Sequence, residues 1–464
     1  MSLPKDGLPA EQVLDEIRAL RTADHPTHGG RLFAYVYDPG LDGLDDLAMA
    51  AYALSAHVNG LDPTAFPSLL AMENALVGAA AGLLGGGPAT VGNVTSGGTE
   101  SLMLAVKAAR DAHPEIERPR LVAPVTAHAA FAKAAHYLGV ALDLVPVSAS
   151  ALRPAPEDVA AAIGSDTVLV ACSAPSYAHG VVDPVAGIAA VAAAAGVRCH
   201  VDACFGGWTL PYLRRLGVQV PPFDLSVPGV TSISVDLHKY AYTPKGVSVL
   251  LHRDAELRRP QYFAYAGWPG YTMVNPVISS TRSGGPIAAA YAVLRHLGDS
   301  GYLALTAKTL EAVRELAAAV SRVDGLRLVA APESTVVCFT ADLFDVFVLA
   351  DELAARGWHT QPQFAYADVP ASIHLSVTAS VAPRVAEFGP DLAAAAEAAR
   401  AAGPVALPEV SLDVPLPELL GALGFGDGIP ERMAPVNALL NAVPPDVREA
   451  LLVDFLGYLQ RPAL

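Results

Sequence analysis

The sequence predicts an α/β protein built around one mainly parallel β-sheet, with a smaller α+β domain toward the C-terminus. Strand-like and helix-like segments alternate from about residue 86 to residue 297, a pattern typical of parallel strands joined by crossover helices. The composition agrees, because 52% of the residues are hydrophobic and only 16% are charged, which suits packed layers and not a disordered chain. With 464 residues, the chain is long enough to form two or three lobes.

Short apolar runs, together with an alternating run at Val230–Asp236, are the predicted strands of the large sheet. They cover Arg120–Pro124, Ala141–Val147, Thr167–Cys172, Val197–Ala203, Val230–Asp236 and Val247–Leu251. The principal helices predicted around them are Ala10–Thr22, Leu44–Ala56, Ser68–Leu84, Thr126–Gly139, Ala155–Ile163, Pro184–Ala195 and Ile287–Leu297. Glycine, proline and other turn residues predict that segments 85–94 and 262–276 are irregular connections.

The segment from residue 302 to residue 402 predicts the smaller domain. Its expected elements are a helix at Tyr302–Val323, strands at Leu326–Ala330 and Val336–Thr340, a helix at Asp345–Arg356, a strand at Ile373–Thr378 and a helix at Asp391–Ala402. This order is βαβ-like. We therefore expect an N-terminal segment at 1–67, a large α/β domain at 68–297, and a small α+β domain at 298–464 that ends in a Pro-rich tail from residue 404.

Charge and composition argue against several classes of function. The net charge of −16 disfavours binding to nucleic acid or to an anionic membrane, because both need a basic protein surface. Residues 1–21 lack the apolar core of a signal peptide, and no unbroken apolar stretch is long enough to span a membrane, so we expect a cytoplasmic protein. Cys199, His200, Asp202 and Cys204 are close in sequence, but neighbours on a strand point to opposite faces, so we expect buried free thiols and no metal.

A lysine just beyond the strand Val230–Asp236 is the first candidate catalytic residue. Lys239 follows His238 at the carboxyl edge of the predicted sheet, where α/β proteins bind their ligands. A lysine there can form a Schiff base with an aldehyde cofactor, provided that its pKa is lowered enough to give the free amine. The alternative is an ordinary surface lysine, which the His-Lys pair alone does not exclude.

Three other segments bring polar residues to the same edge. Ser96-Gly-Gly-Thr99 opens a helix, where free backbone N–H groups either bind a phosphate or form a simple cap and turn. Asp202 ends a buried strand and needs a partner, which is either a protonated ring nitrogen of a cofactor or a basic side chain of this chain. His128 lies in the first turn of its helix, where a packing role is the alternative.

Five passages occur in an order that is specific to one superfamily. They are Val94–Ser101, Ala127–His136, Cys172–Pro175 with His179–Pro184, His200–Ala203, and Val230–Lys239 with Tyr242–Gly246. With these passages the chain resembles the pyridoxal-phosphate-dependent decarboxylases of fold type I, and most of all the sphingosine-1-phosphate lyases, over roughly residues 30–380. The resemblance implies a mainly parallel, seven-stranded type of sheet and pyridoxal 5'-phosphate as cofactor.

The resemblance also implies a role for each matching residue at the cofactor. Lys239 carries the pyridoxal as a Schiff base, Asp202 pairs with the pyridine nitrogen, and His128 stacks on the ring. The implied contacts of the cofactor phosphate are Gly98, Thr99 and His238. Ser173 is the implied contact of the 3-hydroxyl on the ring.

Residues implied in substrate handling include one departure from the lyases. Lys245 matches a lysine of the lyases that is placed to meet substrate phosphate or assist proton transfer, and Tyr37 matches a tyrosine implicated in substrate handling. Asn59 begins a segment that matches a substrate-binding stretch of the family, but Asp62 stands where the lyases have a histidine that helps to hold phosphate. A carboxylate repels a phosphate, so the substrate does not follow from the resemblance.

Three functions stay open. The first is a carbon–carbon lyase that cleaves a β-hydroxy amine, phosphorylated or not, by a retro-aldol reaction. The second is an amino-acid decarboxylase, which breaks a Cα–C bond into the same electron sink. A catalytically silent binding subunit is the third, and the retention of Lys239, Asp202 and His128 argues against it. Fold type I further implies a homodimer, with residues 267–286 contributed across the interface.

Overall fold

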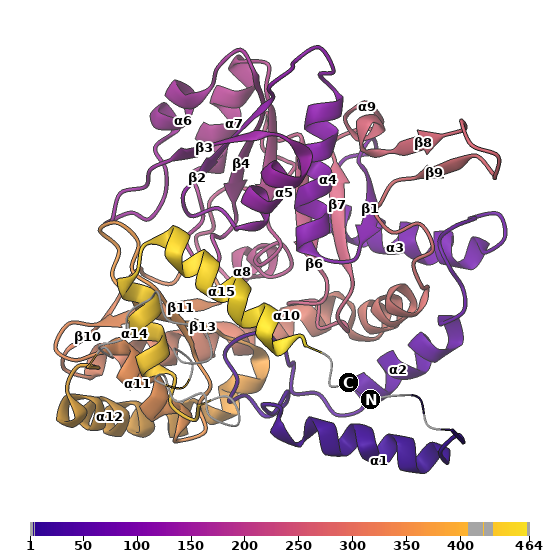
Figure 1. Ribbon diagram of the computed structural model, residues 1–464. Coiled ribbons are helices and arrows are strands. Elements are labelled where there is room, and N and C mark those ends of the chain that lie inside the picture. Colours follow the sequence, from indigo (N-terminus) through magenta and orange to yellow (C-terminus); the bar gives the residue numbers. More distant parts are fainter. Residues whose placement is uncertain (1–2, 4, 407–420, 422–429, 462–464) are drawn as a thin grey trace.

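A computed structural model describes residues 3, 5–406, 421 and 430–461, and its centre is a seven-stranded sheet (Figure 1). The strand order is β1-β7-β6-β5-β4-β2-β3. The strands are β1 Val91–Thr95, β2 Arg120–Pro124, β3 Ala141–Val145, β4 Thr167–Ser173, β5 Arg198–Asp202, β6 Ser232–Asp236 and β7 Ser248–His252. Five of them run parallel from β3 to β6, and β7 is antiparallel to both of its neighbours. This mixed, mainly parallel sheet confirms the predicted fold class.

Most helices of this part of the chain connect or cover the strands, whereas the first, Ala10–Leu20, has no buried residue. The helices are α1 Ala10–Leu20, α2 Leu44–Ser55, α3 Pro67–Leu83, α4 Gly98–Asp111, α5 Ala130–Leu138, α6 Pro156–Ala162, α7 Val185–Ala194, α8 Leu210–Arg215 and α9 Ala255–Arg258, with short 3₁₀ turns at Arg21–Ala23 and Arg259–Gln261. Every residue of β4 and β6 is buried. Burial on both faces explains the mainly apolar sequence of β4. Strand β6 alternates polar and apolar residues, and its buried Ser232 and Ser234 hydrogen-bond to His200 of β5.

The carboxyl ends of three adjacent parallel strands meet at one edge of the sheet. Ser173 ends β4 and lies opposite Asp202, which ends β5, while Asp202 lies opposite Ser234 of β6. Strand β6 continues for two more residues and ends at Asp236. The register therefore brings the polar strand ends to the edge at which α/β sheets bind ligands.

Two segments expected to be irregular contain strands. Residues 85–94 were expected to form a glycine-rich connection, yet β1 begins at Val91 and pairs antiparallel with β7, where Gly92 allows the carbonyl of Leu250 to approach closely. The expected loop 262–276 is a β-hairpin, with β8 at Phe263–Tyr265 and β9 at Met273–Asn275. Glycine and proline suggested breaks in both cases, but pairing with a partner strand outweighs weak local propensity.

The smaller domain contains a four-stranded antiparallel sheet in the order β10-β11-β13-β12. Its elements are β10 Leu326–Leu328, β11 Val336–Ala341, α11 Val346–Ala354, β12 Gln361–Gln363, β13 Ser372–Ser376, the 3₁₀ helix η3 Ala379–Arg384 and α12 Val385–Ala402. The expected βαβ-like arrangement is formed by β11, α11 and β12, because β11 and β12 both run antiparallel to β13 and therefore parallel to each other. The chain adds β12 after α11 and then reverses through a bridge between Tyr366 and Val369, so that β13 returns antiparallel to β11.

Helix α10, Gly285–Arg322, joins the two cores (Figure 1). The two helices expected here form one element that kinks at Gly298, where φ is 60° and ψ is 179°. Tyr302 of α10 packs in the core under the large sheet, and Leu316 packs in the core of the small domain. The domain boundary expected at residues 297 and 298 coincides with this kink and stays a prediction.

The C-terminal segment is described in part. Helices α14 Ala434–Ala442 and α15 Pro445–Leu459 lie within the expected tail, and much of the tail between residues 407 and 429 lies outside the described residues. Within the described ranges, no helix is long and apolar enough to cross a membrane.

Candidate active site

A cavity of about 480 Å³ opens at the carboxyl edge of the large sheet. Its walls come from the ends of β5 and β6, the start of α4, and the loops that follow β2, β4 and β6. Among the residues predicted from the sequence, those that line it are Gly98, Thr99, His128, Asp202, His238, Lys239 and Lys245. The predicted residues Tyr37, Ser173, Asn59 and Asp62 do not line it.

The Lys239 amine is held beside a carboxylate that sequence reasoning did not include in the site. Lys239 lies in the turn that follows β6, and its Nζ is 3.0 Å from Oδ2 of Asp236. Burial lowers the pKa of Lys239, but the charge of Asp236 together with Tyr37, Cys204 and Asp202 outweighs burial and holds that pKa above its ordinary value. The lowered pKa expected for a Schiff-base lysine is therefore wrong for the chain alone, since the ammonium form is favoured.

Asp236 connects three polar groups below the cavity. Its carboxylate accepts a hydrogen bond from Ser248 Oγ at 2.5 Å, and Oδ2 is 3.7 Å from Nε2 of His238. Burial raises the pKa of Asp236, but the charges of Lys239 and His238 reverse that effect and hold it below the ordinary value. The available signal in the sequence was a charged residue at the end of a predicted strand, directly before the His-Lys pair.

The start of α4 provides a place for an anion. Helix α4 begins at Gly98, and its N-terminal backbone N–H groups lie at the cavity. A Cβ atom on Gly98 would lie 2.9 Å from Asp236 Oδ1 and 2.9 Å from Cys204 Sγ, so only glycine fits here. His238 is the neighbouring ring, and its Nδ1 accepts a hydrogen bond from Val247 N–H at 3.3 Å. This cradle suits a phosphate group.

Asp202 and His128 lie at the cavity as the sequence predicted. Asp202 is 7% exposed, and its Oδ1 accepts a hydrogen bond from the backbone N–H of Cys204 at 3.0 Å. A buried carboxylate that lines the cavity can pair with a protonated ring nitrogen. His128 accepts a hydrogen bond at Nδ1 from Ala130 N–H at 3.1 Å, which fixes the ring at the start of α5.

Ser173 lies at the end of β4, behind the cavity wall. Its backbone N–H donates to Asp183 Oδ2 at 2.7 Å. Its hydroxyl is buried and has no hydrogen-bond partner among the described residues. Burial raises the pKa of Asp183 to about 7, so this carboxyl is partly protonated near neutral pH. The predicted contact of Ser173 with a ring hydroxyl stays a prediction.

Lys245 and Tyr37 meet beside the cavity. Lys245 Nζ lies 5.0 Å from the centroid of the Tyr37 ring. Burial, with the nearby charge of Lys239, lowers the pKa of Lys245 to about 8. The Tyr37 ring contacts Tyr240 and Phe205 at centroid distances of 5.0 and 6.1 Å, and burial raises the pKa of its hydroxyl. Tyr37 is thus placed against residues of the cavity wall.

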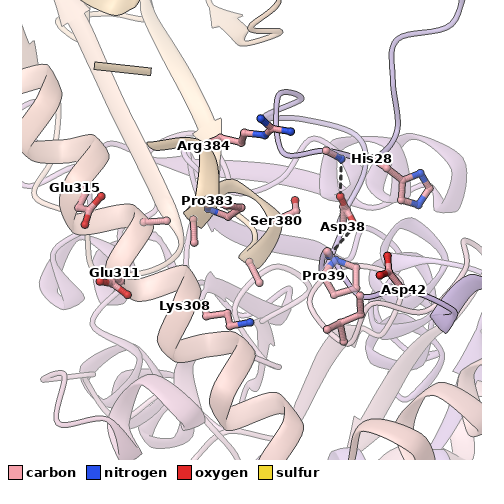
Figure 2. Close-up of a pocket in the computed structure, with 16 residues that line it drawn as sticks. His28, Asp38, Pro39, Asp42, Lys308, Glu311, Glu315, Ser380, Pro383 and Arg384 are labelled. Carbon is pink, nitrogen blue, oxygen red and sulfur yellow. Dashed lines mark hydrogen bonds between the residues drawn. The ribbon is translucent and has the colours of Figure 1, made fainter. Parts of the chain in front are cut away.

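The segment that carries Tyr37 is anchored by its neighbour Asp38. Oδ2 of Asp38 accepts a hydrogen bond from Gly29 N–H at 3.0 Å, and Oδ1 accepts one from Gly40 N–H at 2.9 Å (Figure 2). This segment, α10 and η3 line a second cavity of about 620 Å³, with Ser380 of η3 facing Asp38 (Figure 2). The small domain therefore helps to hold Tyr37 in place.

The predicted substrate residues Asn59 and Asp62 lie away from the cavity in an exposed loop. Asp62 Oδ1 accepts hydrogen bonds from the backbone N–H of Thr64 at 2.8 Å and from its hydroxyl at 2.6 Å. These bonds lower the pKa of Asp62. The backbones of Asn59 and Ser283 pair in an isolated antiparallel β-bridge. Their contact with substrate stays a prediction, because within this chain Asp62 forms a turn and does not reach Lys245.

Two aromatic residues of the cavity wall were missed by sequence reasoning. Phe205 lies 5.6 Å from Lys239 Nζ, measured to the ring centroid. Tyr177 lines the cavity between His128 and Phe205, with ring centroid distances of 6.4 and 5.7 Å. Phe205 follows Asp202 closely in sequence, which was an available signal, whereas a tyrosine in a loop carried none.

Comparison with known proteins identifies the class of this enzyme. The pyridoxal-dependent decarboxylase conserved domain matches residues 2–342, and the C-terminal HTH domain of pyridoxal-dependent enzymes matches residues 390–458. The chain therefore belongs to the pyridoxal-dependent decarboxylase family and is a pyridoxal-phosphate-dependent lyase.

Its relatives within that family include sphingosine-1-phosphate lyases. The chain is 37% identical to the sphingosine-1-phosphate lyase of Arabidopsis thaliana over 414 residues, which are 87% of this chain and 75% of that protein. The solved structure of Burkholderia pseudomallei sphingosine-1-phosphate lyase matches with a TM-score of 0.81 and 37% identity, covering 87% of this chain and 94% of that one. A Pyrococcus furiosus protein named "Probable L-aspartate decarboxylase" is 30% identical over 77% of this chain and 94% of its own length.

Proposed function

We propose that this protein is a carbon–carbon lyase that cleaves a β-hydroxy amine by a retro-aldol reaction, with phosphorylated long-chain amino alcohols of the sphingosine-1-phosphate type as the first substrates to test. The observation that carries the proposal is the pair Lys245 and Tyr37, which meet beside the Lys239 cavity. An amino-acid decarboxylase has no need of this pair. The 37% identity to sphingosine-1-phosphate lyases supports the same choice.

The residues of the cavity fit pyridoxal phosphate. The N-terminus of α4 and His238 would hold the phosphate, Asp202 the ring nitrogen, His128 the ring face and Lys239 the aldehyde carbon. When bound, the cofactor supplies an electron sink for cleavage of a bond at the substrate's Cα. Asp236 sets the charge at Lys239 Nζ, and the buried aromatic wall excludes water.

Lys245 and Tyr37 would act on the substrate. In a retro-aldol cleavage the Cα–Cβ bond breaks, the β-hydroxyl loses its proton to give an aldehyde, and Cα gains a proton to give a shorter amine. With a pKa of about 8, Lys245 Nζ both carries positive charge for a phosphate and can exchange a proton near neutral pH. The Tyr37 ring lies beside Lys245 Nζ, and its hydroxyl would contact the same substrate group.

The second candidate is a decarboxylase of α-amino acids. Asp62, in place of a phosphate-binding histidine, favours it, as does the 30% identity to the Pyrococcus furiosus relative. If the protein is such a decarboxylase, Asp62 faces a cationic or hydroxylated group of an unphosphorylated substrate.

We also propose a homodimer that is completed by the hairpin β8–β9. Its side chains Phe263, Tyr265, Trp268 and Tyr271 are between 43% and 53% exposed. In Figure 1 the hairpin extends from the body of the protein on the side of α9. A set of exposed aromatic residues of this kind marks a protein–protein contact.

The proposed reaction is tested by analysing products of the holoenzyme by mass spectrometry. Substrates are a phosphorylated β-hydroxy amine, its unphosphorylated form, and a panel of α-amino acids. We expect a long-chain aldehyde and phosphoethanolamine from the first, with no product from a Lys239→Ala control. Release of CO₂ from an amino acid without any aldehyde from the β-hydroxy amines would replace the proposal with the decarboxylase.

A further inference from the structure

Glu100 is a buried carboxylate beside the phosphate cradle. It lies in the first turn of α4, two residues after Gly98, and it is 8% exposed. Its side chain also lines the active-site cavity. A negative group at this place repels the phosphate that the cradle would bind, and its burial adds a desolvation cost. Glu100 must therefore make contacts that outweigh both effects.

The two oxygens of Glu100 accept hydrogen bonds from two separate segments of the chain. Oε2 accepts one from the backbone N–H of Ser96, at 2.6 Å, in the turn that leads from β1 into α4. Oε1 accepts one from the backbone N–H of Ile278, at 2.7 Å, which lies 178 residues further along the chain. A carboxylate offers acceptors on both oxygens, whereas the amide of a glutamine offers one acceptor and one donor group. Glutamate is therefore suited to joining two N–H donors.

Ile278 belongs to the segment between β9 and α10, residues 276–284, which we call the strap. The start of the strap is packed against the helix that carries Glu100. Val277 is buried in a small cluster with Leu104 of α4 and Leu250 of β7. The hydrogen bond from Ile278 to Glu100 thus lies next to an apolar contact that holds the same part of the strap in place.

The end of the strap holds the loop between α2 and α3. The backbone N–H of Gly60 donates to the carbonyl of Arg282 at 3.0 Å, and the N–H of Gly284 donates to the carbonyl of Val58 at 2.6 Å. This loop contains the predicted substrate residue Asp62. The strap therefore connects the start of α4 with a loop that is distant from it in sequence.

We propose that Glu100 is a positioning residue that fixes the backbone of the phosphate cradle and ties it to the strap, so that binding of the cofactor phosphate orders the strap. The coupling is reciprocal, because a strap that is held in place favours the cradle conformation that binds phosphate. The inference concerns the binding of the cofactor and not the reaction, so it holds for either candidate function.

Titration of the full chain with pyridoxal phosphate, and with pyridoxal, which lacks the phosphate, tests the role of Glu100 in the cradle. Glu100→Gln keeps the length of the side chain but only one acceptor, and Glu100→Asp keeps the charge but is too short to reach both donors. Each variant should bind pyridoxal phosphate about tenfold more weakly, the effect of one hydrogen bond to a charged group, and bind pyridoxal as the wild type does. Glu115→Gln removes the same charge from an exposed residue beyond α4 and is the matched control.

The sign of the change in Glu100→Gln separates positioning from charge. If Glu100 acted only through its charge, its removal would tighten the binding of pyridoxal phosphate, because a repelling group beside the phosphate is lost. Unchanged or tighter binding in this variant would therefore overturn the inference. An equal loss of affinity for both ligands would show general damage to the cavity and would overturn it as well.

Hydrogen exchange tests the connection from the cradle to the strap. Pyridoxal phosphate should slow the exchange of backbone amides in residues 276–284 of the wild type, and pyridoxal should not. The slowing should be lost in Glu100→Gln and retained in Glu115→Gln. Exchange in the strap of the wild type that does not respond to pyridoxal phosphate would overturn the coupling. Neither measurement uses a substrate, so their failure is separate from that of the retro-aldol function, which the product analysis decides.

Discussion

The ammonium of Lys239 is surrounded by groups that favour its charged form. Asp236 lies at 3.0 Å, and its charge together with those of Tyr37, Cys204 and Asp202 outweighs the effect of burial on the pKa. Lys245 lies nearby and forms no ion pair with a carboxylate of the described residues, so burial dominates and lowers its pKa to about 8. Two lysines of one cavity thus have pKa values shifted in opposite directions, which assigns them different roles.

The lowered pKa of Lys245 predicts the pH dependence of substrate binding. Lys245 is charged below about pH 8 and neutral above it, so kcat/KM for a phosphorylated substrate should fall as the pH rises through about 8. Lys245→Arg stays charged, and its profile should not fall in that range. The measurement is kcat/KM from pH 6.5 to 9.5 for both enzymes, and identical profiles would show that Lys245 does not bind the phosphate.

Asp62→His tests the charge argument for the substrate. If Asp62 faces an unphosphorylated substrate, the change should raise activity toward phosphorylated amino alcohols and lower it toward the native substrate, because it removes a repelling carboxylate. Thr64→Ala loses the side-chain hydrogen bond to Asp62 without changing the charge and is the matched control. No change in either activity would show that position 62 does not contact substrate.

At the scale of elements, an ion pair ties the segment before α10 to the sheet. Arg282 pairs with the buried Glu73 of α3, and both also hydrogen-bond to the backbone of Val94 in β1. Arg282→Met leaves Glu73 buried without its partner, which should cost about 3–5 kcal/mol and lower the thermal unfolding midpoint. Arg327→Met breaks the exposed pair with Asp342 and should cost less than about 1 kcal/mol. Equal shifts in the two variants would contradict this account.

Most elements of the large sheet could be predicted because its parallel strands are short runs that are apolar or alternate apolar with polar residues, bounded by turn residues. The boundaries of β2 were predicted without error, and β4 and β6 within a few residues. Strand β1 and the hairpin β8–β9 could not be predicted, since Gly92 and the Trp268-Pro-Gly270 turn suggest breaks unless the partner strand is known. The kinked continuity of α10 likewise depends on packing at both of its ends.

The site could be predicted where a residue lies in a motif, and not where it reaches the site through a contact distant in sequence. Lys239, Asp202 and His128 were predicted to meet and they line one cavity. His374 lies on a strand of the small domain, and only the packing of β13 against the loop at Tyr177 brings it near the site. No local pattern signals such a contact.

At the scale of the whole molecule, both domains contribute to the cavity. The large sheet provides its floor, and the small domain supports its wall through contacts such as the hydrogen bond from Tyr240 Oη to the carbonyl of Val377, at 3.0 Å. The exposed aromatic hairpin lies outside both cores. A partner subunit would cover it.

The homodimer is predicted to depend on that hairpin. Phe263→Glu with Tyr265→Glu places charges on the proposed contact and should convert the dimer to a monomer with reduced activity, measured by light scattering and turnover. Leu144→Glu, on a residue that is equally exposed on β3, is the control and should stay dimeric. A wild-type monomer that turns over substrate would contradict the prediction.

The central claim is that Lys239 in this cavity carries the cofactor. The most direct measurement is to reduce the holoenzyme with borohydride, digest it and locate the pyridoxyl group by mass spectrometry. We predict the modification on Lys239, and its loss together with the aldimine absorbance in Lys239→Ala. A pyridoxyl group on Lys245 would contradict the account.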